Sequence, residues 1–133
     1  MITKIDHIGI AVKSIENELK LYTEVLGLQL KDVEVVEDQK VKTAIIPVGE
    51  VKIELLESTD PEGPIGKFVE SKGEGLHHLA FEVDKVEEAL ATVKDKGVAL
   101  IDETPRGGVE NSRIAFLHPK STRRVLMELT ETA

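Results

Sequence analysis

Two segments of the chain repeat each other, and this repeat limits the possible folds more than any other feature. The first segment covers residues 4–12 (KIDHIGIAV) and the second covers residues 75–83 (GLHHLAFEV). His7 and His78 occupy the same place in the two copies, 71 positions apart (78 − 7), and the flanking apolar residues keep that offset. Such self-similarity is typical of a chain built from two copies of one supersecondary unit. We therefore expect two similar modules with one histidine each.

Each copy is followed by a second matching segment that carries a glutamate. These segments are residues 51–55 (VKIEL) and 125–129 (VLMEL), and Glu54 and Glu128 are 74 positions apart (128 − 54). Apolar residues alternate along both segments, so each glutamate points away from the face that packs on helices. A carboxylate on an inward sheet face needs a compensating partner, because an unpaired buried charge is costly. Two histidines and two glutamates are enough for a metal site between the halves.

The remaining pattern predicts the order β-α-β-β-β in each half. Ser14 is a predicted helix N-cap, and Gly27 and Gly97 are predicted to end helices. The chain is expected to be one α+β domain, residues 1–133, with modules at about 1–57 and 75–133. The expected elements of the first half are strand 4–12, helix 15–26 and strands 28–37, 40–48 and 51–57. A linker (58–64) and a short helix (65–71) lead to strand 76–83, helix 85–96, strand 98–101, a loop (104–111) and strands 112–117 and 124–130.

Composition excludes several classes of protein. The net charge of −8 and the low aromatic content (three Phe, one Tyr, no Trp) argue against nucleic-acid binding. No apolar run approaches the roughly 18 residues that span a membrane. The absence of cysteine leaves His, carboxylate and amide groups as metal ligands, which favours Mn, Co, Ni, Fe or Zn. No signal-peptide pattern begins the chain, so we expect a cytoplasmic protein.

The segments DHIGIAV, LHHLAF, KIELLE, FLHPKS and VLMEL, in this order, resemble the vicinal oxygen chelate (glyoxalase/bleomycin resistance/dioxygenase) superfamily. Within it the chain is most similar to the methylmalonyl-CoA epimerase family, from about residue 2 to 129. The resemblance implies paired βαβββ modules that form a cupped, barrel-like mixed sheet with a metal site. It also implies a CoA thioester substrate, a role in propionate metabolism, a homodimer and a divalent metal ion, Co²⁺ first and Mn²⁺, Ni²⁺ or Zn²⁺ as alternatives. The implied metal ligands are His7, Glu54, His78 and Glu128, the second of which is Gln in some relatives.

The implied reaction interconverts (R)- and (S)-methylmalonyl-CoA by removing and returning the proton at C2. The metal would stabilise the developing oxyanion, and an acid/base is needed on each face of C2. Glu128 is the predicted catalytic residue. Some relatives carry a second glutamate near the position of Thr43, which has no carboxylate here. Glu37, Lys42 and Lys52 are candidates for the second acid/base.

Two other functions stay open: a glyoxalase I-like lyase, and a metal-free small-molecule binding protein of the same fold.

The remaining motifs each have a structural and a functional interpretation. Gly107-Gly108 is expected to form a flexible lid or a turn, because it lacks the strand-to-helix context of a phosphate loop. The other residues are His77, interpreted as structural, His118, interpreted as a turn or surface residue, and Lys120, Arg123 and Arg124, which are either solvated or contact CoA phosphates.

Overall fold

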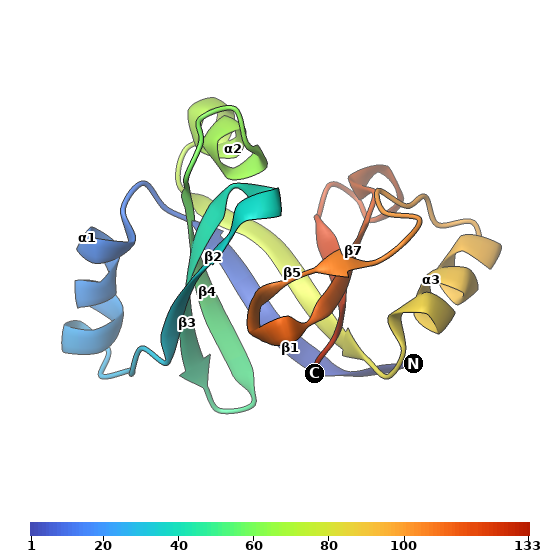
Figure 1. The fold of residues 1–133 in the computed structure, drawn as a ribbon, viewed down its shortest axis with the longest axis horizontal. Helices are drawn as coiled ribbons and strands as arrows, with labels where there is room; N and C mark the ends of the chain where they lie inside the picture. The colour runs from blue at the N-terminus through green and yellow to red at the C-terminus, as the bar shows by residue number, and fades with distance from the viewer. The chain divides into compact units, whose positions relative to one another are not determined.

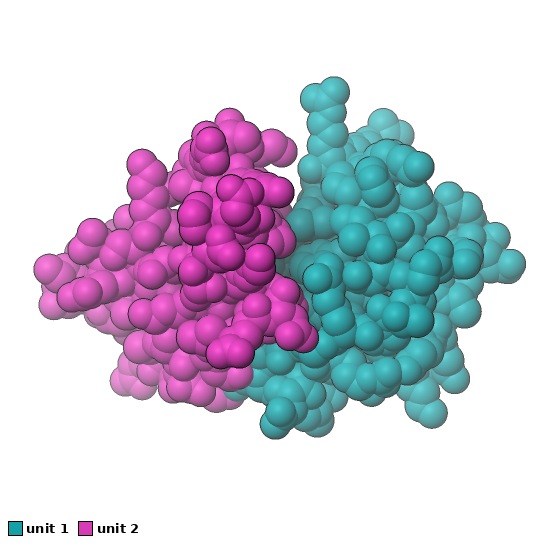
Figure 2. Space-filling model, turned by 45° about the horizontal axis from the view of Figure 1, so that its top comes forward, with its two compact units in different colours: residues 1–6, 78–133 teal, residues 7–77 magenta.

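The computed structural model describes residues 1–133, which divide into two compact units. We refer to residues 7–77, which are magenta in Figure 2, as the first unit, and to residues 1–6 with 78–133, which are teal, as the second unit. The boundaries fall inside two strands, β1 (Ile2–Ala11) and β5 (Gly75–Val83). Each of these strands carries one of the repeated histidines.

The first unit has the predicted β-α-β-β-β order, in which β1 is parallel to β4 and the other pairs are antiparallel. The strands lie in the order β2-β3-β4-β1. Its elements after β1 are α1 (Ile15–Lys20), a π-helical turn η1 (Leu21–Val25), β2 (Asp32–Val36), a 3-10 turn η2 (Glu37–Gln39), β3 (Val41–Val48), β4 (Val51–Ser58) and α2 (Pro64–Lys72).

Helix α1 covers one face of these strands (Figure 1). Ser14 begins the helix as predicted: its backbone is extended and its side chain accepts a hydrogen bond from Asn17 N at 3.2 Å. Glu57 Oε1 accepts a second bond, from Ile15 N at 2.7 Å. The helix buries its apolar side in a core cluster made of Val12, Ile15, Ala44, Ile46 and Leu55.

The opposite face of the same strands carries a second cluster and the predicted site residues. Ala11, Val41, Leu56 and Ile65 form this cluster, and Phe68 and Val69 of α2 pack against it. Since Leu55 belongs to the α1 side, the alternation of β4 turns Glu54 to this second face. The predicted direction of Glu54 is therefore confirmed.

The second unit repeats the architecture around α3 (Val86–Asp95). Its strands lie in the order β5-β8-β7-β6, with β5 parallel to β8 and the other pairs antiparallel. The remaining elements are β6 (Arg106–Gly107), a 3-10 turn η3 (Val109–Asn111), β7 (Arg113–Leu117), a 3-10 turn η4 (Pro119–Ser121) and β8 (Met127–Glu131). The buried core consists of Val83, Val86, Ala89, Leu90, Ala115, Leu117 and Leu129.

The strand predicted at 98–101 does not form, and this part of the prediction is wrong. Leu100 makes one isolated bridge to Leu117, while Val98 N bonds Val93 O and Ala99 N bonds the Ser121 hydroxyl. Ile101 N also bonds Phe116 O and His118 N bonds Ala99 O, both at 2.9 Å, so the segment runs beside the end of β7 without forming a full ladder. The first β-strand after α3 is instead β6, inside the segment predicted as a loop.

Two other predicted boundaries are wrong, whereas the helix predicted over 15–26 is confirmed as α1 continued by the π-helical turn η1 to Val25. The strand predicted from residue 28 begins at Asp32. The last strand begins at Met127, because Arg123 and Arg124 have left-handed φ values of 56° and 74° that interrupt an extended chain. Val125, predicted to lie on the apolar face that packs on helices, is consequently 44% exposed.

The fold class is α+β with two β-α-β-β-β modules, as predicted. None of the helices has the length and the apolar run that crossing a bilayer takes.

Candidate metal centre

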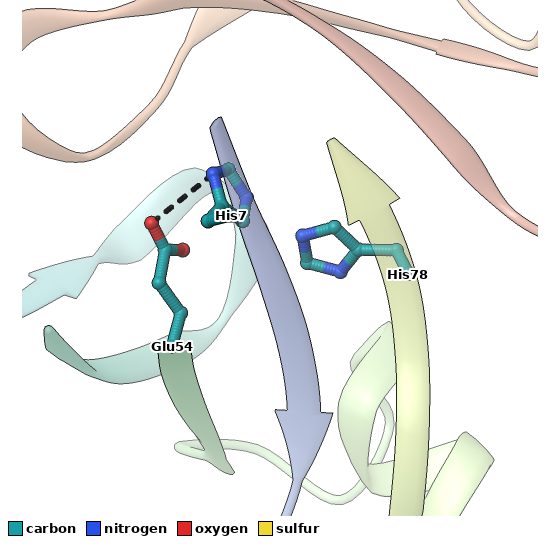
Figure 3. Close-up of side chains that lie close together, drawn as sticks. All are labelled: His7, Glu54 and His78. Atoms are coloured by element: carbon teal, nitrogen blue, oxygen red, sulfur yellow. Dashed lines mark ion pairs between the residues drawn. The ribbon is translucent and has the colours of Figure 1, made fainter. Parts of the chain in front are cut away.

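The first histidine–glutamate pair lies on β1 and β4. The parallel register aligns Gly9 with Glu54, so His7, two residues earlier on β1, points to the same face. His7 Nδ1 lies 3.3 Å from Glu54 Oε2, and both side chains are about 5% exposed (Figure 3). The pair is thus a carboxylate and an imidazole held together away from water.

The second pair repeats this geometry on β5 and β8. The parallel register aligns Ala80 with Glu128, and His78 again lies two residues earlier. His78 Nε2 lies 3.5 Å from Glu128 Oε1, and both side chains are nearly fully buried. The sequence repeat is therefore also a repeat of strand register. In each half, the glutamate pairs with the residue that lies two positions after the histidine.

One ligand atom each from His7, Glu54 and His78 lies within 4.8 Å of the others, and all three residues are buried (Figure 3). Glu54 Oε2 is buried and accepts no hydrogen bond, although it forms the ion pair with His7. Imidazole nitrogens with a carboxylate and no thiolate suit a divalent transition metal. The residues present therefore fit the divalent metal that the resemblance implies.

The two glutamates differ in what holds them. Thr130, which is 2% exposed, donates its hydroxyl hydrogen to Glu128 Oε2, while Oε1 faces His78. The repeat offset of 74 places Leu56 at the position equivalent to Thr130 (130 − 74), so Glu54 has no matching hydroxyl. Glu128 therefore has one anchored oxygen and one oxygen directed at the histidine.

His78 is also supported by residues that the sequence analysis missed. The ring of Phe116 meets His78 edge-on, with centroids 5.8 Å apart, and the Arg106 guanidinium lies 5.1 Å from the Phe116 ring centroid. Asp102 Oδ2 accepts hydrogen bonds from Phe116 N at 2.8 Å and Arg106 Nε at 3.3 Å. Asp102 and Arg106 lie in non-periodic sequence, so no pattern marked them as supports of the site.

Comparison with known proteins establishes the family. A family model described as the Glyoxalase/Bleomycin resistance protein/Dioxygenase superfamily matches residues 6–116. The chain belongs to this superfamily.

Three similar proteins cover nearly the whole chain. The Bacillus subtilis protein YqjC, called uncharacterized, is 45% identical over 96% of this chain and 91% of its own. The mitochondrial methylmalonyl-CoA epimerase of Dictyostelium discoideum is 34% identical over 98% of this chain and 79% of its own. A solved structure of methylmalonyl-CoA epimerase in complex with methylmalonyl-CoA and NH4⁺ has a TM-score of 0.97 and 37% identity, covering 100% of this chain and 96% of that chain.

The other motifs have structural roles within this superfamily fold. His77 contacts Phe68 edge-on at 4.9 Å, which confirms its structural role. His118 is exposed and accepts a hydrogen bond from Lys120 N at 3.0 Å, which confirms its role in a turn. Gly108 belongs to a packed turn, because a Cβ there would lie 2.6 Å from Ser112 Oγ.

Replacing His78 with alanine should abolish metal uptake while the protein stays folded. The substitution removes a ligand atom from the buried group, whereas the strand pairing of β5 is made by backbone atoms. Metal content after gel filtration, measured by mass spectrometry alongside circular dichroism, checks this. His118→Ala removes an exposed histidine and is the matched control, which should keep its metal. Stoichiometric metal in folded His78→Ala would contradict the assignment.

Proposed function

We propose that this protein is a methylmalonyl-CoA epimerase that interconverts the two epimers by proton transfer at C2. The observation that carries the proposal is the buried set of His7, Glu54 and His78, joined by Glu128 through its pairing with His78. The full-length similarity to epimerases supports the same substrate, since one of them is solved with methylmalonyl-CoA.

The chemistry of the substrate explains why such a site is needed. C2 of methylmalonyl-CoA lies between a thioester and a carboxylate, and loss of its proton puts negative charge on the thioester oxygen. A divalent metal held by His7, Glu54, His78 and Glu128 would act as a Lewis acid that stabilises this charge. We propose Co²⁺ as the metal, with Mn²⁺, Ni²⁺ and Zn²⁺ as alternatives that the same nitrogen and oxygen donors accept.

Glu128 is the residue that we propose to move a proton at C2. Its carboxylate is buried, and Thr130 holds Oε2 in place, so Oε1 is the oxygen that would leave the metal and carry a proton along a fixed direction. Exclusion of water strengthens the electrostatic interactions of such a group. Glu54, which has Leu56 at the position equivalent to Thr130, would serve as a ligand alone.

Basic residues next to β8 are proposed to contact the CoA phosphates. Lys120, Arg123 and Arg124 are exposed and lie in the turn that leads into the strand carrying Glu128. A protein with a net charge of −8 needs local positive charge to hold an anionic ligand. Residues 120–124 thus supply three cations shortly before β8.

The experiment that tests the proposed function is entry of solvent deuterium at C2 of methylmalonyl-CoA. The purified protein should catalyse both epimerisation and exchange, and a chelator should stop both until metal is restored. Mass spectrometry of the recovered thioester gives the exchange. Activity on a hemithioacetal with none on the CoA thioester would instead identify a glyoxalase I-like lyase. Ligand binding without metal and without turnover would identify a binding protein.

Glu128→Gln should lower C2 proton exchange by at least about 10²-fold for the epimer that Glu128 deprotonates, the effect typical of removing an acid/base. It should keep some metal, because an amide oxygen still coordinates. Glu54→Gln is the matched control, with the same change on the other ligand, and should be far milder. Equal losses in the two variants would show that both carboxylates are only ligands.

We also propose a symmetric homodimer in the cytoplasm. Strands β2 and β6 end the strand order in their units, and natural proteins cover or pair such edges. Apolar side chains are exposed in the first unit, among them Val25 at 73% and Leu26 at 57%. Twofold dimers are the commonest oligomers. Sedimentation velocity at micromolar concentration should give about twice the chain mass, and a monomer alone would contradict the dimer.

A further inference from the structure

We propose that Glu34 of β2 is the second proton carrier, acting on the face of C2 opposite to Glu128. The inference deepens the proposed epimerase function and rests on it. The observation behind it is a juxtaposition: Glu34 lies directly opposite Thr43, on the sheet face that carries Glu54.

Inversion at C2 requires one group to take the proton and another to return one from the other side. Glu128 supplies one of these groups. Thr43 is buried in β3 with an exposed fraction of 2%, and its hydroxyl is neither an acid nor a base near neutral pH. The chain therefore needs a second acid/base close to this position.

Strand register places Glu34 on the face of the metal ligands. Glu34 pairs with Thr43 across β2 and β3, and Thr43 pairs with Leu56 across β3 and β4. Directly paired residues of antiparallel strands project to the same side of the sheet. Leu56 lies two residues after Glu54 and shares its face. Glu34 therefore lies on the same face as Glu54, two strands away and displaced by two residues along the strand direction.

The alternation along β2 gives the same orientation independently. Val36, two residues from Glu34, packs against the cluster formed by Ala11, Val41, Leu56 and Ile65. Val33 and Val35 point the other way and are 36% and 55% exposed. Glu34 itself is half-buried. Its carboxylate is therefore turned toward the inner face while keeping some access to solvent, as a proton carrier requires.

The spacing of the strands separates a proton carrier from a metal ligand. Neighbouring strands lie about 4.8 Å apart, so β2 is roughly 10 Å from β4 at the backbone. Glu34 accordingly lies outside the group of His7, Glu54 and His78. A substrate bound over the intervening strand β3 would bring C2 within the reach that proton transfer from Glu34 needs, directly or through one water.

The residues considered from sequence fit less well. Lys42 points to the same face of β3 as Ala44 and Ile46, and this face packs against α1. Glu37 is exposed in η2. Lys52 does share the face of Glu54, in the row of His7, but a lysine side chain is a cation at neutral pH and has no lone pair to accept a proton.

The step balances with the groups named. The Glu34 carboxylate takes the C2 hydrogen as a proton, and the C–H electron pair shifts toward the thioester oxygen. Protonated Glu128 then gives its proton to the opposite face of C2 as the electron pair returns. The product is the other epimer, with Glu34 protonated and Glu128 ionised. The reverse direction exchanges the two roles.

The test gives each epimer separately to Glu34→Gln in deuterated water. Epimerisation should fall by at least about 10²-fold. One epimer should still exchange its C2 proton through Glu128, while the other stays inert. Glu128→Gln should show the opposite preference between epimers. The metal content of Glu34→Gln should match that of the wild type, because Glu34 is not a metal ligand. Glu37→Gln, a nearby exposed carboxylate, should be normal, and Glu34→Asp should keep more activity than Glu34→Gln.

Several outcomes would overturn the proposal. Epimerisation by Glu34→Gln within a few-fold of wild type would contradict it, as would equal loss of exchange from both epimers. One-sided loss in Lys52→Met, with Glu34→Gln active, would assign the role to Lys52. If the wild type itself exchanges no C2 proton, the proposed function fails and this inference fails with it.

Discussion

The buried contact between a carboxylate and an imidazole is the interaction on which the structure of the site depends. Glu54 and Glu128 are each about 3% exposed, and an ionised carboxylate at that depth is costly without a compensating charge. The parallel pairings of β1 with β4 and of β5 with β8 place a histidine beside each glutamate. A divalent cation would neutralise the remaining negative charge of the glutamates. Their burial, which is unfavourable for folding without such a cation, therefore favours metal binding.

The repeat contains two similar histidine–glutamate pairs, and small differences in the surrounding residues indicate different roles for the two pairs. Thr130 anchors one oxygen of Glu128, while the equivalent position beside Glu54 is Leu56. Phe116 contacts the His78 ring and is itself held by Asp102. These contacts make the second pair the more constrained one. We infer that the second half carries proton chemistry as well as the metal, and that the first half supplies ligands and, through Glu34, the opposing acid/base.

The parts of the structure that could be predicted from sequence are those set by local periodicity. Alternation along residues 51–55 gave the direction of Glu54, and the repeat marked the histidines. The missing strand at 98–101 and the short β6 depend on which distant groups satisfy the backbone, as Ser121 does for Ala99. The position of Glu34 could not be predicted from sequence for a similar reason. Its alignment with Thr43 depends on the turn η2, where Lys40 has a left-handed φ of 54°.

The central claim is that the buried group of His7, Glu54 and His78 holds a divalent metal ion. X-ray absorption spectroscopy of the protein loaded with cobalt, combined with the cobalt-to-chain ratio, tests it most directly. The account predicts one ion per chain with two imidazole ligands at roughly 2.1 Å, close to the distances known for zinc and histidine. Two ions per chain with a single imidazole each, or a bound ion without imidazole, would contradict it.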